Sequence, residues 1–260
     1  MVALVCGVLS ACGGSSGTDA GTRVDSGSTT GDVDSGQPVV DAGAVDAGCL
    51  LLETADGGCI PLLFSNVCSV PKLTVVHTGD SYDDNAGTAM AASLAAHCTP
   101  PQTVRTLNWR DAGILDSTGA PLVARDDVLL CGGGSFNQPH IEWLENTGVT
   151  QVYDSSTPTV ASMTRRGGAM IFAEPVANLN QSLDFFVLQL ARGRPGGPVT
   201  ISGYGMYAPG TTAAAYYFEH NVLPALSTHS ENFYVVKWTD LDADALPSQA
   251  AEFTVLASGH

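Results

Sequence analysis

A unit of apolar strand, polar glycine-rich turn and helix occurs three times after residue 71, and it constrains the fold more than any other feature. The strands and helices of the three copies are expected at 72–78 and 86–97, at 127–131 and 139–146, and at 198–202 and 211–226. Further apolar runs supply strands at 102–107, 150–153, 169–173, 233–237 and 252–256. Strands that alternate with helices predict an α/β fold with a single doubly wound, mostly parallel sheet.

The polar turns of these units are the expected binding site, because ligands of doubly wound sheets bind at the carboxyl ends of the strands. Candidate ligand-binding residues in the turns are Gly132, Gly133, Asn137, Gly203, Tyr204 and Thr211. The glycine run at 132–134 could cradle a phosphate at the start of the next helix. It matches neither G-x-G-x-x-G nor a P-loop, which favours simple turn geometry. Tyr204 and Tyr207 either stack on a sugar ring or lock the loop to the sheet, and burial is slightly favoured.

The beginning of the chain carries a targeting signal. Leu9, Ser10, Ala11 and Cys12 end an apolar run that is too short to span a membrane. This pattern resembles the lipobox of bacterial lipoproteins, in which the peptide is cut before the cysteine and the thiol is diacylated. The resemblance implies a signal peptide at 1–11 and a lipid anchor on Cys12. Because signal peptides open with basic residues and the first charge here is Asp19, we expect a basic region upstream of Met1.

The residues after Cys12 divide into three parts. A Gly/Ser/Asp/Ala-rich tract at 12–48 is predicted to be a disordered tether with a reach of about 35 Å. A cysteine-bearing collar follows at 49–70, where two apolar runs flank an Asp-Gly-Gly turn and predict a hairpin. The α/β domain is expected at 71–260. The chain has 26 acidic and 10 basic residues and a formal net charge of -16, which argues against a nucleic-acid partner.

The cysteines after Cys12 predict disulfides, since an oxidising envelope favours them. We pair Cys49 with Cys59 and Cys68 with Cys98, and expect Cys131 to stay free and buried at a strand end. The cysteine and histidine spacings do not fit a metal site, and the aspartates of the tether are too sparse for a calcium loop. No metal and no cofactor are therefore predicted.

Three segments of the domain carry a resemblance to a known family. The stretch at 83–96 looks like its first alanine-rich helix, 127–137 like a strand that ends in Gly-Gly-Pro followed by Asn, and 199–215 like a strand, Gly-Tyr turn and Thr-x-Ala-Ala helix. These segments resemble the Rossmann-like domain of surface-layer and cell-wall-binding proteins, over about two thirds of the domain. Departures are Gly134 in place of Pro and a long irregular stretch between Gly148 and Ala177. The resemblance implies a non-catalytic envelope module.

An enzymatic alternative uses the same turns. Gly79, Asp80 and Ser81 are similar to the nucleophile block of SGNH esterases and lipases, and Gly134 with Asn137 is similar to their oxyanion block. That resemblance implies Ser81 as nucleophile and Asn137 as oxyanion donor. The family's Asp-x-x-His block is missing from the carboxyl end. We expect His77 to be packed at a strand end, and His140, His220 and His229 to be surface residues.

The sequence thus favours a lipid-anchored lipoprotein of the bacterial cell envelope, exposed at the outer membrane or extracellular face. Its domain would serve as a non-catalytic binding or structural module. The expected partners are the membrane, through Cys12, and an envelope or cell-wall polysaccharide. The alternative is a divergent SGNH-like esterase.

Overall fold

The computed structural model describes residues 52–53, 59–60, 62–123 and 126–260. All of them belong to the second of two compact units, Ala44–His260. The predicted signal peptide at 1–11, the anchor residue Cys12, the tether at 12–48 and Cys49 lie outside the described residues.

A seven-stranded sheet forms the centre of the domain, in the order β12-β11-β9-β10-β5-β3-β4. Four neighbouring strands run parallel to one another: β10 (Val199–Gly205), β5 (Asp127–Gly132), β3 (Lys72–His77) and β4 (Thr103–Asn108). Beyond them lie β9 (Leu183–Ala191), antiparallel to β10, then β11 (Phe233–Thr239) and β12 (Phe253–Gly259), each antiparallel to its neighbour. Because β11 again points the same way as β10, the sheet is mostly parallel, and the α/β class is confirmed.

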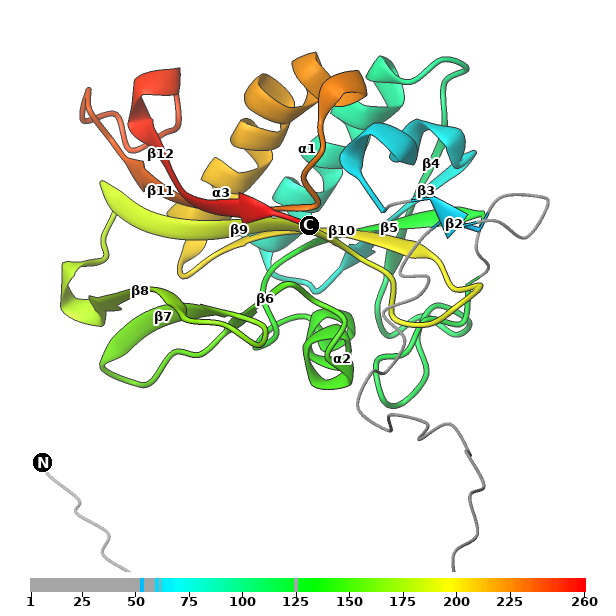
Figure 1. Ribbon diagram of the computed structural model, residues 1–260, viewed down its shortest axis with the longest axis horizontal. Coiled ribbons are helices and arrows are strands. Elements are labelled where there is room, and N and C mark those ends of the chain that lie inside the picture. The colour runs from blue at the N-terminus through cyan, green and yellow to red at the C-terminus, as the bar shows by residue number, and fades with distance from the viewer. Residues whose placement is uncertain (1–51, 54–58, 61, 124–125) are drawn as a thin grey trace, which may run out of the picture. The chain divides into compact units, whose positions relative to one another are not determined.

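One face of the sheet is covered by helices. Figure 1 shows α1 (Ser81–His97) and α3 (Ala208–Tyr217) side by side on this face. A π turn, Phe218–Val222, and a 3-10 turn, Leu223–Thr228, extend α3. Met90 and Leu94 of α1 and Ala213 of α3 are fully buried against the sheet. The small side chains of both helices allow close packing, which places the first turns of α1 and α3 next to the strand ends.

The opposite face carries α2 (Pro139–Thr147) and a small antiparallel sheet. That sheet consists of β6 (Val152–Asp154), β7 (Val160–Arg165) and β8 (Met170–Pro175). The strands expected at 150–153 and 169–173 correspond to β6 and β8, whereas β7 between them was not predicted. The stretch between Gly148 and Ala177, a departure from the family pattern, is therefore a regular small sheet. In β7 the three consecutive residues Ala161, Ser162 and Met163 are all buried, so the strand lacks the simple alternation of buried and exposed side chains that would mark it in the sequence.

The segment before β3 belongs to the same core. Strands β1 (Leu52–Glu53) and β2 (Cys59–Ile60) pair antiparallel, as the predicted hairpin requires. The 3-10 helix Phe64–Ser69 follows and buries Phe64 and Val67 beneath the helical face.

Two of the cysteine predictions are confirmed. Cys68 and Cys98 form a disulfide that ties the 3-10 helix to the end of α1. Cys131 is a free, fully buried thiol in β5. The Cys49–Cys59 pairing stays a prediction, since Cys49 is outside the described residues. None of the helices in the described part of the chain has the length and hydropathy of a membrane span.

Candidate functional site

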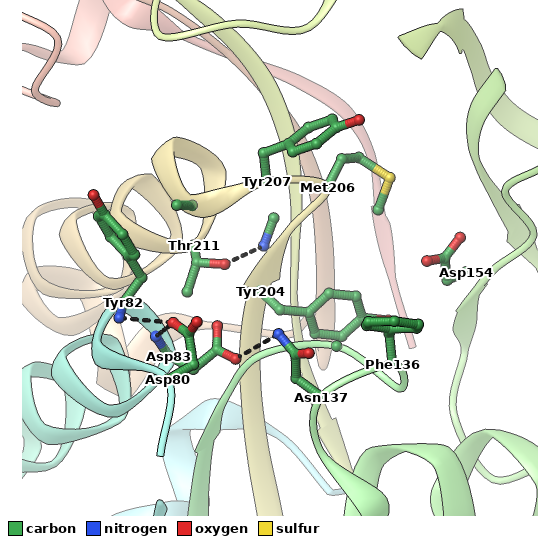
Figure 2. Close-up of a pocket in the computed structure, with 13 residues that line it drawn as sticks. Asp80, Tyr82, Asp83, Phe136, Asn137, Asp154, Tyr204, Met206, Tyr207 and Thr211 are labelled. Carbon is green, nitrogen blue, oxygen red and sulfur yellow. Dashed lines mark hydrogen bonds between the residues drawn. The ribbon is translucent and has the colours of Figure 1, made fainter. Parts of the chain in front are cut away.

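A cavity of about 310 Å³ lies where the polar turns after β3, β5 and β10 converge. Its walls come from the first turn of α1, the turn after β5, the turn between β10 and α3, and β6. Figure 2 shows the labelled side chains around it. The lining residues are Asp80, Tyr82, Asp83, Gly134, Phe136, Asn137, Asp154, Tyr204, Gly205, Met206, Tyr207, Ala208 and Thr211. The structure thus brings the predicted turns together at one edge of the sheet.

The N-terminus of α1 is capped by the carboxylate side chain of its N-cap residue. Asp80 is the N-cap residue, and its Oδ1 accepts hydrogen bonds from the backbone N–H groups of Tyr82 (2.9 Å) and Asp83 (3.4 Å). One turn later, Asp84 Oδ1 accepts from the backbone N–H of Thr78 at 2.7 Å. Two of the backbone donors that could bind an external anion at this helix end, those of Tyr82 and Asp83, are therefore already satisfied.

Asp83 is the buried carboxyl of the cavity. Only 5% of the residue is exposed, and its Oδ2 accepts a hydrogen bond from Asn137 Nδ2 at 3.1 Å (Figure 2). Burial raises the pKa of Asp83 to about 6, with smaller contributions from the neighbouring carboxylates Asp80 and Asp84, while the bond from Asn137 acts in the opposite direction. Asn137, one of the predicted site residues, thus lies in the cavity and orients Asp83.

Gly132 and Gly133 serve the approach of α1 to the sheet. A Cβ atom on Gly132 would lie 2.0 Å from the backbone oxygen of Asp83, and one on Gly133 would lie 2.3 Å from Asp83 Oδ2. Gly133 also has a φ of +86°, a conformation that favours glycine. Neither residue is among those that line the cavity, so the glycine run is explained by turn geometry and close packing.

The N-terminus of α3 is capped from a neighbouring strand. The Asp184 side chain of β9 is fully buried, and its Oδ2 accepts from the backbone N–H groups of Gly210 (2.8 Å) and Tyr207 (3.0 Å). Burial raises the pKa of Asp184 to about 7, although the N–H groups that donate to it act in the opposite direction. Thr211, a predicted site residue, lines the cavity and accepts from the backbone N–H of Gly205 at 3.0 Å.

Tyr204 and Gly203 have mainly structural contacts. Tyr204 is 1% exposed, and its hydroxyl donates to Glu145 Oε1 of α2 at 2.7 Å, which fixes the edge of its ring against the cavity. The preference for a buried tyrosine is confirmed here. Gly203 lies inside β10 beneath α1, where a Cβ would approach the Met90 sulfur to 3.0 Å. Of the six candidate binding residues, Asn137, Tyr204 and Thr211 line the cavity.

Three aromatic side chains stand exposed at this cavity. Tyr82 is 54% exposed, Phe136 99% and Tyr207 46%, and no other aromatic residue in the described ranges is exposed. Tyr207 therefore differs from the buried Tyr204. Sequence reasoning missed Tyr82, Phe136 and the acids Asp83 and Asp154. A signal was present, since Phe136 stands beside Asn137 in the same turn.

The cavity is acidic. Asp80, Asp83 and Asp154 line it, and within the described residues no Lys, Arg or His does. Carboxylates accept hydrogen bonds, so the cavity offers acceptors and aromatic faces to a ligand. This arrangement suits a neutral molecule with several hydroxyl donors.

Ser81 and the histidines do not form a catalytic pair in the described part of the chain. Ser81 is the exposed first residue of α1, and no hydrogen bond joins its hydroxyl to a histidine. His77 is half-buried, and its Nε2 lies 3.2 Å from Thr88 Oγ1. The prediction of a surface position for His140 is wrong. It is buried between Gly119 O (2.9 Å) and Thr200 Oγ1 (2.8 Å), and burial lowers its pKa to about 4.

One cluster of acids could hold a cation. Asp240, Asp242 and Asp244 each offer a carboxylate oxygen, and these oxygens lie within 4.8 Å of one another. Asp240 already accepts from the backbone N–H groups of Ala243 (2.8 Å) and Ala245 (3.0 Å). Asp240 therefore has a structural role, because its side chain bonds the backbone of its own loop.

Comparisons with protein families, with curated proteins and with solved structures find no match for this chain.

Proposed function

We propose that the protein is a lipid-anchored lipoprotein of the bacterial cell envelope whose α/β domain binds neutral carbohydrate without catalysis. Cys12 would carry the lipid, because Leu9, Ser10 and Ala11 before it resemble a lipobox. The tether at 12–48 would hold the domain away from the membrane, toward an envelope polysaccharide.

The observation that carries this proposal is the combination of exposed aromatic faces and carboxylates around one cavity. Tyr82, Phe136 and Tyr207 present apolar rings, and Asp83 and Asp154 present acceptors. Sugars combine apolar ring faces with hydroxyl donors, so both kinds of group find partners. An exposed aromatic cluster of this kind is typical of a binding surface.

Anionic ligands are disfavoured at the same place. Two N–H groups at the start of α1 are bonded to Asp80, and two at the start of α3 are bonded to Asp184. A phosphate would meet further carboxylates and no cation from the described residues that line the cavity. These contacts favour a neutral sugar over a nucleotide or a sugar phosphate.

We further propose that the domain is a variant of the Rossmann-like domain that it resembles in surface-layer and cell-wall-binding proteins. The supporting observations are the parallel β10-β5-β3-β4 core and a cavity at the carboxyl ends of its strands. In this variant, β9 pairs antiparallel with β10. On the second face of the sheet, a small antiparallel sheet lies where a doubly wound fold would have further helices.

Binding is tested by affinity chromatography of the purified protein on chitin, cellulose, amylose and dextran supports, and by co-sedimentation with peptidoglycan sacculi. Each assay is run at low and physiological salt. We expect retention on at least one support at both salt concentrations, since a neutral ligand gives little salt dependence. Tyr207→Ala should weaken retention about tenfold by removing a stacking face.

Leu122→Ala is the matched control, because Leu122 is 53% exposed and is not among the cavity residues. It should be retained like the wild type. Loss of retention on every support and on sacculi would overturn the carbohydrate proposal. The carbohydrate proposal would also be overturned if the protein bound a lysine-rich peptide, if Tyr207→Ala abolished that binding, and if no sugar competed with the peptide.

Anchoring is tested separately by mass spectrometry of the mature amino terminus. We expect a chain that starts at Cys12 and carries the mass of its acyl groups. A mature protein that begins at another residue, or an unmodified Cys12, contradicts this part of the proposal.

A further inference from the structure

We infer that the ligand is a linear polysaccharide that crosses three adjoining cavities, with the acidic cavity in the middle. This inference rests on the proposed carbohydrate binding and specifies its ligand as a chain rather than a single sugar. Three further cavities share wall residues with the central one. One of them, of about 560 Å³, shares Phe136 and Asp154 and is lined by further acids, Glu142 and Glu145, whereas the other two flank the central cavity with aromatic side chains.

The first flanking cavity lies toward the edge of the sheet at β4. It measures about 320 Å³ and shares Asp80, Phe136 and Asn137 with the central cavity. Its outer wall is formed by Trp109 and Arg110, which follow β4, and the Arg110 guanidinium lies 4.2 Å from the centre of the Trp109 ring. This cavity therefore adds a large aromatic side chain and a hydrogen-bond donor group beside the acidic centre.

The second flanking cavity lies between α1 and α3. It measures about 430 Å³, and Tyr82 forms part of both this cavity and the central one. Its other walls include Asn85 of α1, Tyr216 of α3 and Leu246 of the loop before β12. The lining is mostly apolar side chains with a few amide, hydroxyl and carboxyl groups, a mixture that fits a sugar ring.

An exposed aromatic side chain stands at each junction between the cavities. Phe136, 99% exposed, stands between the central cavity and the Trp109 cavity, and Tyr82, 54% exposed, stands between the central cavity and the α1–α3 cavity. A single sugar ring in the central cavity would leave much of these two rings in water. A chain that passes from cavity to cavity covers both, and the apolar area that it removes from water favours the longer ligand.

The central cavity alone is also at the small end of the usual range. Binding sites for small molecules measure about 300 to 1,000 Å³, and the central cavity has about 310 Å³. Each flanking cavity is at least as large. Three places of similar size in succession are what successive units of one chain require.

The experiment measures affinity against chain length by isothermal titration calorimetry, with the purified protein and chito-, cello-, malto- and isomalto-oligosaccharides of one to six units. For the sugar type that binds, we expect affinity to rise through at least three units and then level off. We expect the total gain from one unit to the plateau to be about tenfold or more, since each flanking cavity adds contacts worth about threefold.

Variants at the two ends locate the added contacts. Trp109→Ala and Leu246→Ala should each lower the affinity for the longest oligosaccharide about threefold and leave the affinity for the shortest unchanged. Their effects should multiply in the double variant, because the two cavities are separated by the central one. Leu241→Ala is the control for Leu246→Ala, since both leucines are 57% exposed and Leu241 is not among the cavity residues.

The outcomes separate the inference from the proposed function. Equal affinity for short and long oligosaccharides overturns the chain inference and leaves carbohydrate binding intact. Absence of binding to every series overturns both. Thermal unfolding of each variant is followed in parallel, because Trp109 is partly packed against the core. If Trp109→Ala fails to fold, the result with Leu246→Ala tests the chain inference. A length-dependent gain that neither end variant reduces also contradicts the inference.

Discussion

Replacement of Asp83 by asparagine is expected to change how stability depends on pH. Asp83 has a pKa of about 6 in the folded protein, against an ordinary value of 3.8. The folded state therefore holds this proton more tightly than the unfolded state does. The resulting stabilisation is fully present below about pH 4 and is lost as the pH rises through about 6.

The magnitude follows from these two pKa values. Between about pH 4.5 and about pH 7.5, linkage predicts that the Asp83 carboxyl loses about 2 kcal/mol of stabilisation. Asparagine does not titrate, so the stability of Asp83→Asn relative to the wild type should rise by that amount. The hydrogen bond from Asn137 is retained, because the new amide oxygen can accept it as Asp83 Oδ2 does at 3.1 Å.

The assay is urea unfolding followed by tryptophan fluorescence at both pH values for the wild type and the variant. Comparing the two proteins at each pH cancels the titrating groups that do not interact with Asp83. Asp116→Asn is the control: Asp116 is exposed at a turn, and hydrogen bonds from Thr118 lower its pKa from the ordinary value of 3.8. Its carboxyl is therefore largely ionised at both pH values in the folded and the unfolded state, and the stability of this variant relative to the wild type should stay nearly unchanged. A difference between wild type and Asp83→Asn that is equal at both pH values would refute the reasoning.

Four further predictions concern other parts of the domain. Asp184→Asn should lower the free energy of unfolding by about 1 to 3 kcal/mol in urea titrations. Both side-chain oxygens of Asp184 accept from backbone N–H groups, so the NH2 group of asparagine would face a donor and leave it without an acceptor. Reduction of Cys68–Cys98, which are 30 residues apart, should cost about 3 to 4 kcal/mol by the same assay. Cys131 should react with a thiol reagent only after unfolding, as mass spectrometry would show, since burial raises its pKa. A fluorophosphonate probe should leave Ser81 unlabelled, and labelling that Ser81→Ala abolishes would support the esterase alternative.

The strands that carry the site could be predicted because each combines an apolar run with a polar turn. The expected strand at 72–78 and the observed β3 differ by one residue, and the expected helix at 139–146 and α2 also differ by one. Prediction failed at β9, which reads as one apolar run interrupted by Asp184 and Gln189. Both of these polar residues are buried. Their hydrogen bonds to the α3 turn and to β6 exist only in the folded chain, so local pattern could not place them.

The candidate site was predictable in position and less so in composition. The carboxyl ends of parallel strands meet at one edge, so the convergence of three turns followed from the fold class. Which side chains face the cavity depends on how close α1 comes to the sheet. Gly132 and Gly133 allow that approach and are covered by it, so the glycines that seemed to mark a ligand contact mark a helix contact.

The carboxylates of Asp80 and Asp184 change the chemistry of this sheet edge. Helix N-termini at such an edge carry partial positive charge and attract phosphates in many α/β proteins. Here each N-terminus already bonds a carboxylate through two backbone N–H groups. A phosphate would have to displace a carboxylate that is held in place, and it would then face Asp83 and Asp154. The side chains that remain for a ligand are therefore largely acceptors and aromatic rings, so a ligand that fits this edge must bring its own hydrogen-bond donors and an apolar face.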